Sequence, residues 1–405
     1  MPANDDASTW PSWITRRRLV GTAVGGWVAA GLSACGIGGG DDADDDTPES
    51  TETPDLTPIP TQAAIGTPVG GYVNPERYLG RTLTVATLTG PYTDAQREAY
   101  FTPFQTATGA EVFARGIGDN VDDLKAQVDG DVVTWDVACI PMDQVRPLAN
   151  DGYLTEIDRA YVDVTVLFPE VVGQYAVGAD LFSTAIVYPV AAAETPSDWG
   201  DFWKVERFGE GRCLRKKPVG TLEFALLADG VSRDELYPLD VDRAFASLDR
   251  IKPHIVQWWE DGKQPSELVA NLQAGLAASW NIRADLQTVR DDVGIQWTVG
   301  MLSADAWVVP RGAPNLDLAM DFINYATRAV PQANFSRLLP YGPVNRAAFD
   351  HIRPDRLPIL PSAQPQFGLQ FFENWNYWID NLDILTDRFN EWLEADPEPT
   401  GTPGA

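Results

Sequence analysis

A tryptophan and an aspartate are the residues of this chain whose types and placement are best suited to bind an organic cation. Trp280, followed by Asn281, ends one apolar run, and Asp305 stands directly before another, Ala306–Pro310. The face of an indole attracts an ammonium group, and a carboxylate gives that attraction a direction. The alternative is a core tryptophan with a surface aspartate, and the pattern alone leaves both interpretations open.

Length and composition limit the class of protein. The 405 residues are enough for two domains or lobes, each with its own core. A formal charge of −28, from 58 acidic and 30 basic side chains, argues against a nucleic-acid partner. The two histidines, His254 and His351, are far apart, no C-x-x-C occurs, and neither a nucleotide-binding loop nor a hydrolase motif is present. We therefore expect a binding protein without a metal or another cofactor.

Residues 1–35 have the features of an export signal. Arginines precede a sixteen-residue apolar run, Leu19–Ala34, which is shorter than the about 20 residues that span a bilayer. The run ends in Leu-Ser-Ala-Cys, which resembles the lipobox of bacterial lipoproteins and implies cleavage before Cys35 with lipid on its sulfur. Arg16 and Arg17 also resemble the twin-arginine export motif.

Residues 36–76 are acidic and rich in proline and threonine. Such a tract cannot bury enough apolar surface to fold, so we expect a disordered tether that holds the folded part away from the membrane. Residues 397–405 have a similar composition and are expected to form a disordered tail.

The part between these tracts alternates strand patterns with helix patterns, which is typical of parallel α/β sheets. The pattern predicts two α/β lobes: lobe 1 from 77–186 plus 303–345, and lobe 2 from 187–302 plus 346–396. The chain passes between the lobes more than once. A ligand cleft is therefore expected at their junction, where small-molecule sites commonly form.

Several further side chains are candidates for that cleft. Tyr92 follows the first predicted strand, and Asp143 follows the third, where it is either a second carboxylate or a helix N-cap. Trp259 belongs to an adjacent tryptophan pair whose members would face opposite sides of a strand. Gln264 lies at a loop-to-helix junction, and Tyr341 lies in a proline-rich turn.

Taken together, the lipobox, the tether and the two lobes resemble the substrate-binding component of an ABC importer, in particular its spermidine/putrescine-binding branch. The resemblance covers about residues 80–395 and implies a type II periplasmic-binding-protein fold that closes on its ligand about a hinge. It is carried by LRKKPVGTLEFALLADGV (214–231), LYPLDVDRAFASLDRIKPHI (236–255), QWWEDGKQPSELV (257–269), SWN (279–281), WVVPRGAPN (307–315) and LPYGPVN (339–345).

The resemblance assigns roles to single residues. Trp280 would stack on the methylene chain of the amine, and Asp305 would bind an ammonium. The relatives carry a second aromatic residue at the position of Ser303, so Trp307 is the candidate replacement here. Two carboxylates of the polyamine pattern fall near Lys217 and a glycine instead, which departs from the family pattern.

The prediction is a lipid-anchored receptor on the outer face of the cytoplasmic membrane, monomeric, which delivers a small amine to an ABC permease and its ATPase. A putrescine- or spermidine-like polyamine is favoured. The alternative is an ω-amino acid such as 4-aminobutyrate, with its ammonium on Asp305 and its carboxylate on Lys217. Less favoured are an exported hydrolase using Asp261 with Asp305 and an iron(III) receptor, because no motif supports either.

Overall fold

The computed structural model of the protein describes residues 69–117, 121–286 and 288–395. The predicted signal peptide with Cys35, most of the tether and the C-terminal tail lie outside these ranges. Within the described part, no helix combines the length and the apolar character that crossing a membrane requires.

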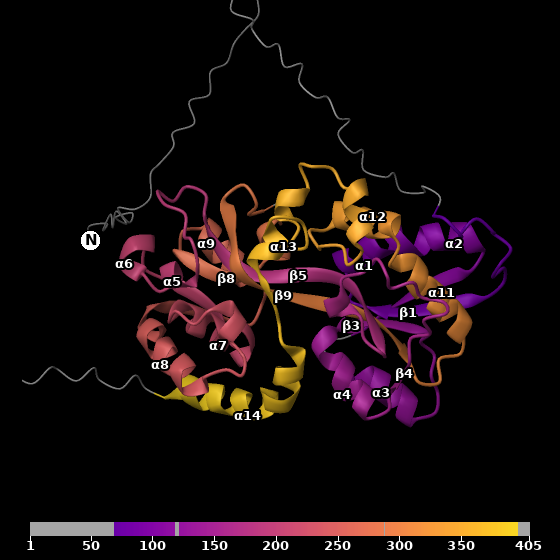
Figure 1. Ribbon diagram of the computed structural model, residues 1–405, viewed down its shortest axis with the longest axis horizontal. Coiled ribbons are helices and arrows are strands. Elements are labelled where there is room, and N and C mark those ends of the chain that lie inside the picture. Colours follow the sequence, from indigo (N-terminus) through magenta and orange to yellow (C-terminus); the bar gives the residue numbers. More distant parts are fainter. Residues whose placement is uncertain (1–68, 118–120, 287, 396–405) are drawn as a thin grey trace, which may run out of the picture. The chain divides into compact units, whose positions relative to one another are not determined.

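One mixed sheet of ten strands runs through the described chain (Figure 1). Its strands are β1 (Thr82–Thr87), β2 (Glu111–Gly116), β3 (Val137–Pro141), β4 (Leu154–Thr155), β5 (Ala176–Pro189), β6 (Arg212–Arg215), β7 (Ile255–Trp259), β8 (Leu276–Trp280), β9 (Val293–Pro310) and β10 (Phe371–Phe372). Their order is β2-β1-β3-β9-β5-β8-β6-β7, with β4 and β10 paired to β9. The strand β1 is parallel to β2 and β3, and β6 is parallel to β7 and β8, as the alternating pattern predicts.

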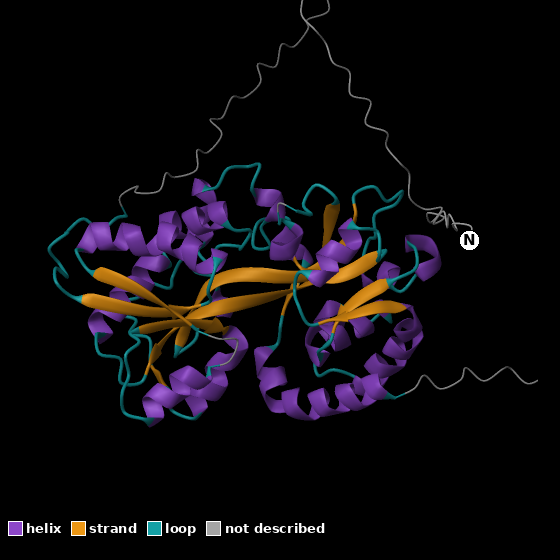
Figure 2. Ribbon diagram, turned by 180° about the vertical axis from the view of Figure 1, so that it is seen from behind, coloured by secondary structure: helices purple, strands orange, loops and turns teal. Residues whose placement is uncertain are grey.

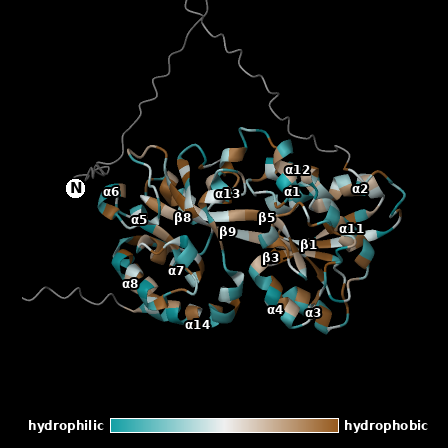
Figure 3. Cartoon of the chain, viewed as in Figure 1, coloured by the Kyte–Doolittle hydropathy of each residue, from teal (hydrophilic) through white to brown (hydrophobic). Residues whose placement is uncertain are grey.

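Helices cover both faces of this sheet (Figure 2). They are α1 (Pro91–Gln96), α2 (Thr102–Thr108), α3 (Asp122–Asp129), α4 (Val145–Asn150), α5 (Trp199–Phe202), α6 (Val205–Phe208), α7 (Pro218–Ala228), α8 (Val241–Ile251), α9 (Gln264–Ala270), α10 (Asn281–Ala284), α11 (Leu316–Ala326), α12 (Ala329–Leu338), α13 (Gln366–Leu369) and α14 (Trp375–Glu394). Hydrophobic residues follow strands such as β1 and β3, while hydrophilic residues recur on the helices outside them (Figure 3).

Two long antiparallel strands, β5 and β9, run through both hydrophobic cores. Leu181 and Trp307 belong to a core with residues of α1, α2 and α11, whereas Ile186 and Met301 belong to a second core with residues of α7 and α8. Figure 1 shows β5 and β9 side by side along the sheet. Crossing strands therefore join two α/β lobes, as predicted.

The C-terminal segment contributes to both cores. Beyond α12, a small apolar cluster packs on Ala333, and β10 then pairs with β9 beside Met301. The helix α14 belongs to the core around α7. The residues of the small cluster are Ala333, Ala348, Ile352, Leu360 and Ala363.

The first helix follows β1 after a short turn. It begins at Pro91, and no side chain caps it. Gly90 precedes it with a φ of 78°, in the region that favours glycine, and proline suits a first helical turn because its φ is already fixed. Tyr92 therefore lies in the first turn of the helix rather than in a loop.

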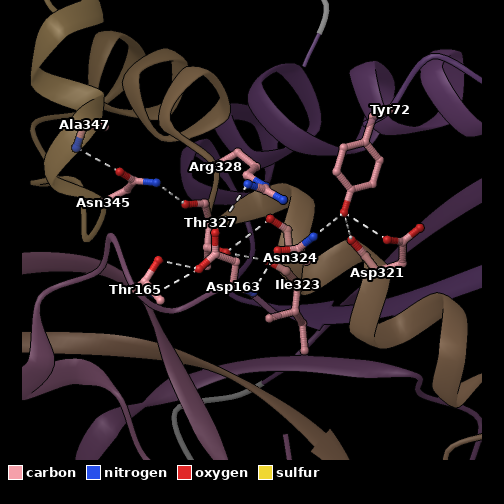
Figure 4. A network of polar contacts seen from close by, with 10 residues as sticks. All are labelled: Tyr72, Asp163, Thr165, Asp321, Ile323, Asn324, Thr327, Arg328, Asn345 and Ala347. Atoms are coloured by element: carbon pink, nitrogen blue, oxygen red, sulfur yellow. Dashed lines mark hydrogen bonds and ion pairs between the residues drawn. The ribbon is translucent and has the colours of Figure 1, made fainter. Parts of the chain in front are cut away.

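A buried polar network holds the start of the described chain against α11 (Figure 4). The hydroxyl of Tyr72 donates to Oδ1 of Asp321 at 2.9 Å and accepts from Nδ2 of Asn324 at 2.8 Å. Burial raises the pKa of Tyr72, and the charge of Asp321 adds to this, so the hydroxyl stays protonated and remains a donor. The amide oxygen of Asn324 in turn accepts from the backbone N–H of Asp163 at 3.1 Å.

We expect Tyr72→Phe to lower the free energy of unfolding by about 1–3 kcal/mol, because it leaves Asp321 and Asn324 buried without their shared partner. Urea denaturation followed by circular dichroism measures this change. Tyr161→Phe is the matched control, since the side chain of Tyr161 is 41% exposed. Equal midpoints for the two variants would contradict the importance of the network.

Candidate ligand-binding site

Two buried carboxylates face each other where β5 and β9 pair. The register shifts between Gly178, which is opposite Ala306, and Asp180, which is opposite Asp305. This β-bulge turns the side chain of Asp180 to the sheet face that carries Asp305, since directly opposite residues project to the same side. Both residues are buried. We call Asp180 and Asp305 the acid pair.

The hydroxyl of Tyr92 covers the acid pair from α1. It donates to Oδ2 of Asp180 at 2.5 Å and lies 3.4 Å from Sγ of Cys139. The other carboxylate oxygen of Asp180, Oδ1, is buried and has no hydrogen-bond partner among the residues that the structure describes. The acid pair therefore has unused capacity to accept a hydrogen bond.

The electrostatics of the acid pair disfavour two negative charges. Burial raises the pKa of Asp305 to about 7, and the charge of Asp143 adds to this effect. Burial also raises the pKa of Asp180 well above its ordinary value, with Asp305 as the next cause. No lysine or arginine in the described ranges forms an ion pair with either carboxylate. A cationic group beside the two carboxylates would favour their charged forms.

An aromatic wall extends from the acid pair along β5. Phe182 and Thr184 follow at every second position and share a face of the strand, and Trp280 of β8 is directly opposite Thr184. The ring centroid of Phe182 lies 6.2 Å from those of Trp280 and Tyr341. The ring of Tyr341 lies 5.3 Å from that of Tyr92. These four aromatic side chains form a continuous apolar surface that suits a methylene chain.

Two arginines lie at the other end of the aromatic wall. The guanidinium carbon of Arg215 is 5.1 Å from the ring centroid of Trp280 and 5.4 Å from that of Trp259. Arg283 lies in α10, three residues after Trp280, and its buried Nε has no hydrogen-bond partner in the described part of the chain. Oε1 of Gln264 is likewise buried and has no hydrogen-bond partner in the described part of the chain. A guanidinium with an unused donor suits a carboxylate ligand.

Tyr341 lies within electrostatic reach of both ends of the site. Burial raises the pKa of its hydroxyl, and the charges of Asp305 and Asp180 raise it further, while the charge of Arg283 acts in the opposite direction. One side chain thus responds to the acid pair and to an arginine. A ligand that touches Tyr341 is therefore within electrostatic range of the acid pair and of Arg283.

Carboxylates partly compensate Arg215. Burial raises the pKa of Asp143, and the charges of Arg215 and Lys217 oppose this shift. Burial also raises the pKa of Glu373 to about 8, with Asp143 as the next cause, and its Oε2 accepts from Oγ of Ser303 at 2.7 Å. The charges of Glu373 and Asp143 in turn act to raise the pKa of Arg215, which its burial lowers. Carboxylates therefore act on Arg215, whereas the buried Nε of Arg283 has no hydrogen-bond partner among the described residues.

Comparison with known proteins decides the class of this protein. Residues 99–362 match the family of bacterial extracellular solute-binding proteins. The chain belongs to this family. It is 34% identical to the gamma-aminobutyric acid-binding protein of Pseudomonas aeruginosa over 320 residues, which cover 77% of this chain and 91% of that protein.

Solved structures of solute-binding proteins resemble it over nearly their whole length. An ABC transporter substrate-binding protein from Bradyrhizobium japonicum has a TM-score of 0.73 at 31% identity, covering 78% of this chain and 100% of that one. A GABA receptor has a TM-score of 0.71 at 34% identity, covering 79% and 100%. The likeness confirms the predicted fold. It also confirms that this solute-binding protein is not an enzyme.

The structure brings four of the predicted site residues together. Asp305, Tyr92, Tyr341 and Trp280 line one continuous surface, linked by Phe182. Three other candidates lie toward the arginine end, where Gln264 begins α9 and where Lys217 acts electrostatically on Asp143.

Two predicted tryptophans are placed differently. Trp307 is fully buried in the core, with its ring 6.1 Å from Tyr100 and 5.5 Å from Phe322, so the aromatic surface beside the acid pair comes from Tyr92 and Tyr341 instead. Trp259 is also fully buried. Its indole N–H donates to the carbonyl of Ala278 at 3.0 Å, and its ring lies edge-on to Trp280 at 5.2 Å, so it supports Trp280 from behind.

The sequence analysis does not identify three side chains of the site, namely Asp180, Phe182 and Arg283. Asp180 is the one charged residue of the largely buried strand β5, which is a signal for a special role, but only the bulge shows which way it points. Phe182 follows it two residues later. Arg283 is three residues beyond Trp280 on a helical turn, a spacing that favours proximity.

We expect Asp305→Asn to stabilise the ligand-free protein at high pH. Because the folded pKa of Asp305 lies above its unfolded value, the folded state binds more protons, and its stability falls as pH rises through that range. The asparagine variant lacks this loss. Its advantage in the free energy of unfolding should grow by on the order of 2–3 kcal/mol between pH 5 and pH 8.

Urea denaturation at the two pH values measures this difference. Asp383→Asn is the matched control. Asp383 is exposed on α14, so this substitution removes the same charge from the surface. The same pH dependence in both variants would show that Asp305 titrates like a surface carboxylate.

Proposed function

We propose that this solute-binding protein captures a short ω-amino acid, with 4-aminobutyrate as the representative ligand, and delivers it to an ABC permease. One observation carries the proposal. At one end of the aromatic wall lies the acid pair, which has no ion-pair partner among the described residues, and at the other end lie Arg215 and Arg283. A zwitterion whose charges are separated by a few methylenes complements both ends at once.

Each part of such a ligand has a partner. The ammonium binds the acid pair, where charge-assisted hydrogen bonds are stronger than neutral ones. The methylene chain packs on Phe182 and Trp280. The carboxylate binds Arg283, whose Nε is buried and unused, with Arg215 close to the Trp280 ring as a second donor. The geometry favours Arg283 over Lys217 for this role, since Lys217 acts on Asp143.

The alternative polyamine ligand fits the arginine end poorly. A second ammonium there would approach Arg215 and Arg283, and like charges at a desolvated site repel strongly. The 34% identical relative from Pseudomonas aeruginosa is a gamma-aminobutyric acid-binding protein, and a similar solved structure is a GABA receptor. Both relatives support the ω-amino acid over putrescine or spermidine.

The sequence supports a location outside the cytoplasm, in line with the family of extracellular solute-binding proteins. The lipobox ending in Cys35 supports lipid anchoring, and the acidic tract after it supports a tether of a monomeric receptor to the membrane. The partners in this proposal are the permease and the ATPase of an ABC importer. The hydrolase alternative loses its basis, because Asp261 is exposed while Asp305 is buried.

Arg283→Met tests the carboxylate end. We expect its dissociation constant for 4-aminobutyrate to rise by roughly two orders of magnitude, since losing one partner of a desolvated charge pair costs about 2–5 kcal/mol. Isothermal titration calorimetry at pH 7 measures the affinity. Arg283→Glu reverses the charge, so it should lose 4-aminobutyrate and gain affinity for putrescine.

Arg290→Met is the matched control for these variants, because Arg290 is exposed on the turn after α10. It should bind 4-aminobutyrate like the wild type. Wild-type protein that binds putrescine as tightly as 4-aminobutyrate would refute the proposed specificity.

Gly262→Ala tests the position of Trp280. A Cβ at Gly262 would lie 2.4 Å from Cζ3 and 2.6 Å from Cε3 of the indole, so the ring must move. We expect 4-aminobutyrate to bind at least about tenfold more weakly, which corresponds to about 1.4 kcal/mol. Gly70→Ala is the control, because a Cβ there meets nothing within 4 Å. Unchanged affinity in Gly262→Ala would show that Trp280 does not contact the ligand.

A further inference from the structure

The acid pair is built from two residues where one carboxylate would suffice to bind an ammonium. Without the register shift after Gly178, Asp180 would be opposite Ala304 and would point to the other face of the sheet. The bulge instead places it opposite Asp305, at a typical Cβ separation of about 5 Å. Like charges opposite each other destabilise a sheet, so this arrangement calls for a compensating partner.

No positive charge in the described part of the chain supplies that compensation. The titratable groups that interact with the acid pair are the hydroxyls of Tyr92 from α1, Tyr100 from the helix Arg97–Phe101 and Tyr341 from the turn after α12, and the thiol of Cys139 from β3. The next charge is negative and belongs to Asp143. The arginine that these interactions include is Arg283, which acts on Tyr341 rather than on the acid pair.

We propose that Asp180 and Asp305 together form the ammonium subsite, that the empty subsite holds one proton, and that an entering ammonium displaces this proton into solvent. This inference rests on the proposed ω-amino acid function and adds to it the protonation change that accompanies binding. We assign this proton to Asp180, because its Oδ1 is buried, has no hydrogen-bond partner among the described residues and becomes a donor when protonated.

The charge balance is simple. The empty acid pair carries one negative charge, because one carboxyl is neutral and the other is ionised. When the ammonium binds, Asp180 loses its proton, the pair carries two negative charges and the cation lies between them. The hydroxyl of Tyr92 still donates to Oδ2 of Asp180, and its own burial keeps it protonated. No other group has to gain or lose a proton.

Binding should therefore become tighter as pH rises. When one proton leaves for each ligand bound, the association constant increases about tenfold per pH unit for as long as the empty pair keeps its proton. Burial raises the pKa of Asp180 well above its ordinary value, and the charge of Asp305 adds to this, while burial raises the pKa of Asp305 to about 7. At pH 8 Asp305 is therefore mostly ionised, and the proposal assigns the remaining proton to Asp180. The ammonium of the ligand itself stays protonated in this range, as a lysine does.

The test is isothermal titration calorimetry of the wild-type protein with 4-aminobutyrate at pH 8, in buffers that differ in ionisation enthalpy. The dependence of the observed heat on buffer gives the number of protons released. We expect about one for the wild type and close to zero for Asp180→Asn, which keeps an oxygen to accept from Tyr92. The control Asp383→Asn should release as many protons as the wild type.

A second measurement is independent of the ligand. Infrared spectroscopy of the empty protein at pH 8 should show the carbonyl absorption of neutral carboxylic acids, to which Glu373 also contributes because its pKa is about 8. The difference spectrum between the wild type and Asp180→Asn should contain one such band, which belongs to the acid pair. The measurement remains informative if Asp180→Asn folds poorly, because the wild-type band and its loss on adding 4-aminobutyrate are themselves predicted.

The outcomes separate the two proposals. Binding of 4-aminobutyrate by the wild type without proton release, or with equal release in Asp180→Asn, overturns the displaced proton and leaves the proposed function intact. Absence of binding to any ω-amino acid refutes the function. In that case the infrared band still decides whether the empty acid pair holds a proton.

Discussion

Two carboxylates buried opposite each other cannot both stay charged without a cation, and the site depends on this constraint. Asp180 and Asp305 come from neighbouring antiparallel strands, so their closeness is fixed by backbone hydrogen bonds rather than by flexible side chains. The fold uses its two longest strands to hold them, and those strands also carry the cores of both lobes. The rigid core thus holds the two carboxylates close together, and a cationic group of a ligand can compensate their repulsion.

The same strands determine what else the ligand meets. Every second residue of β5 faces the same way, so the face that starts at the acid pair continues to Phe182 and reaches Trp280 through the pairing with β8. Beyond it, Arg215 ends β6 and Arg283 lies in α10, both in the part that packs around the second lobe. A ligand with charges at its two ends therefore links elements on both sides of the crossing strands, which is the arrangement that favours closure of two lobes on a solute.

The sequence predicts the fold better than it predicts the site, and the reason lies in the backbone. Alternating strand and helix patterns suffice for two α/β lobes, and the ends of strands point to Tyr92, Trp280 and Asp305. The role of Asp180 depends on a one-residue bulge, which periodicity does not reveal, because a shift of one residue exchanges the two faces of a strand. Trp307 fits the aromatic position equally well by spacing, but the helices around Tyr100 and Phe322 bury it.

Under the proposed function, selectivity for a zwitterion follows from where the charges lie. The formal charge of −28 draws cations toward the protein at long range without distinguishing one amine from another, and salt screens this attraction beyond about 8–10 Å. Discrimination would then have to arise inside the site, where desolvation strengthens each charge. There the acid pair would reject a plain carboxylate, and Arg283 would reject a second ammonium. Only a ligand that carries both groups would satisfy both ends. In this proposal the acidic surface increases the rate of encounter, while Arg283 determines which amine is retained.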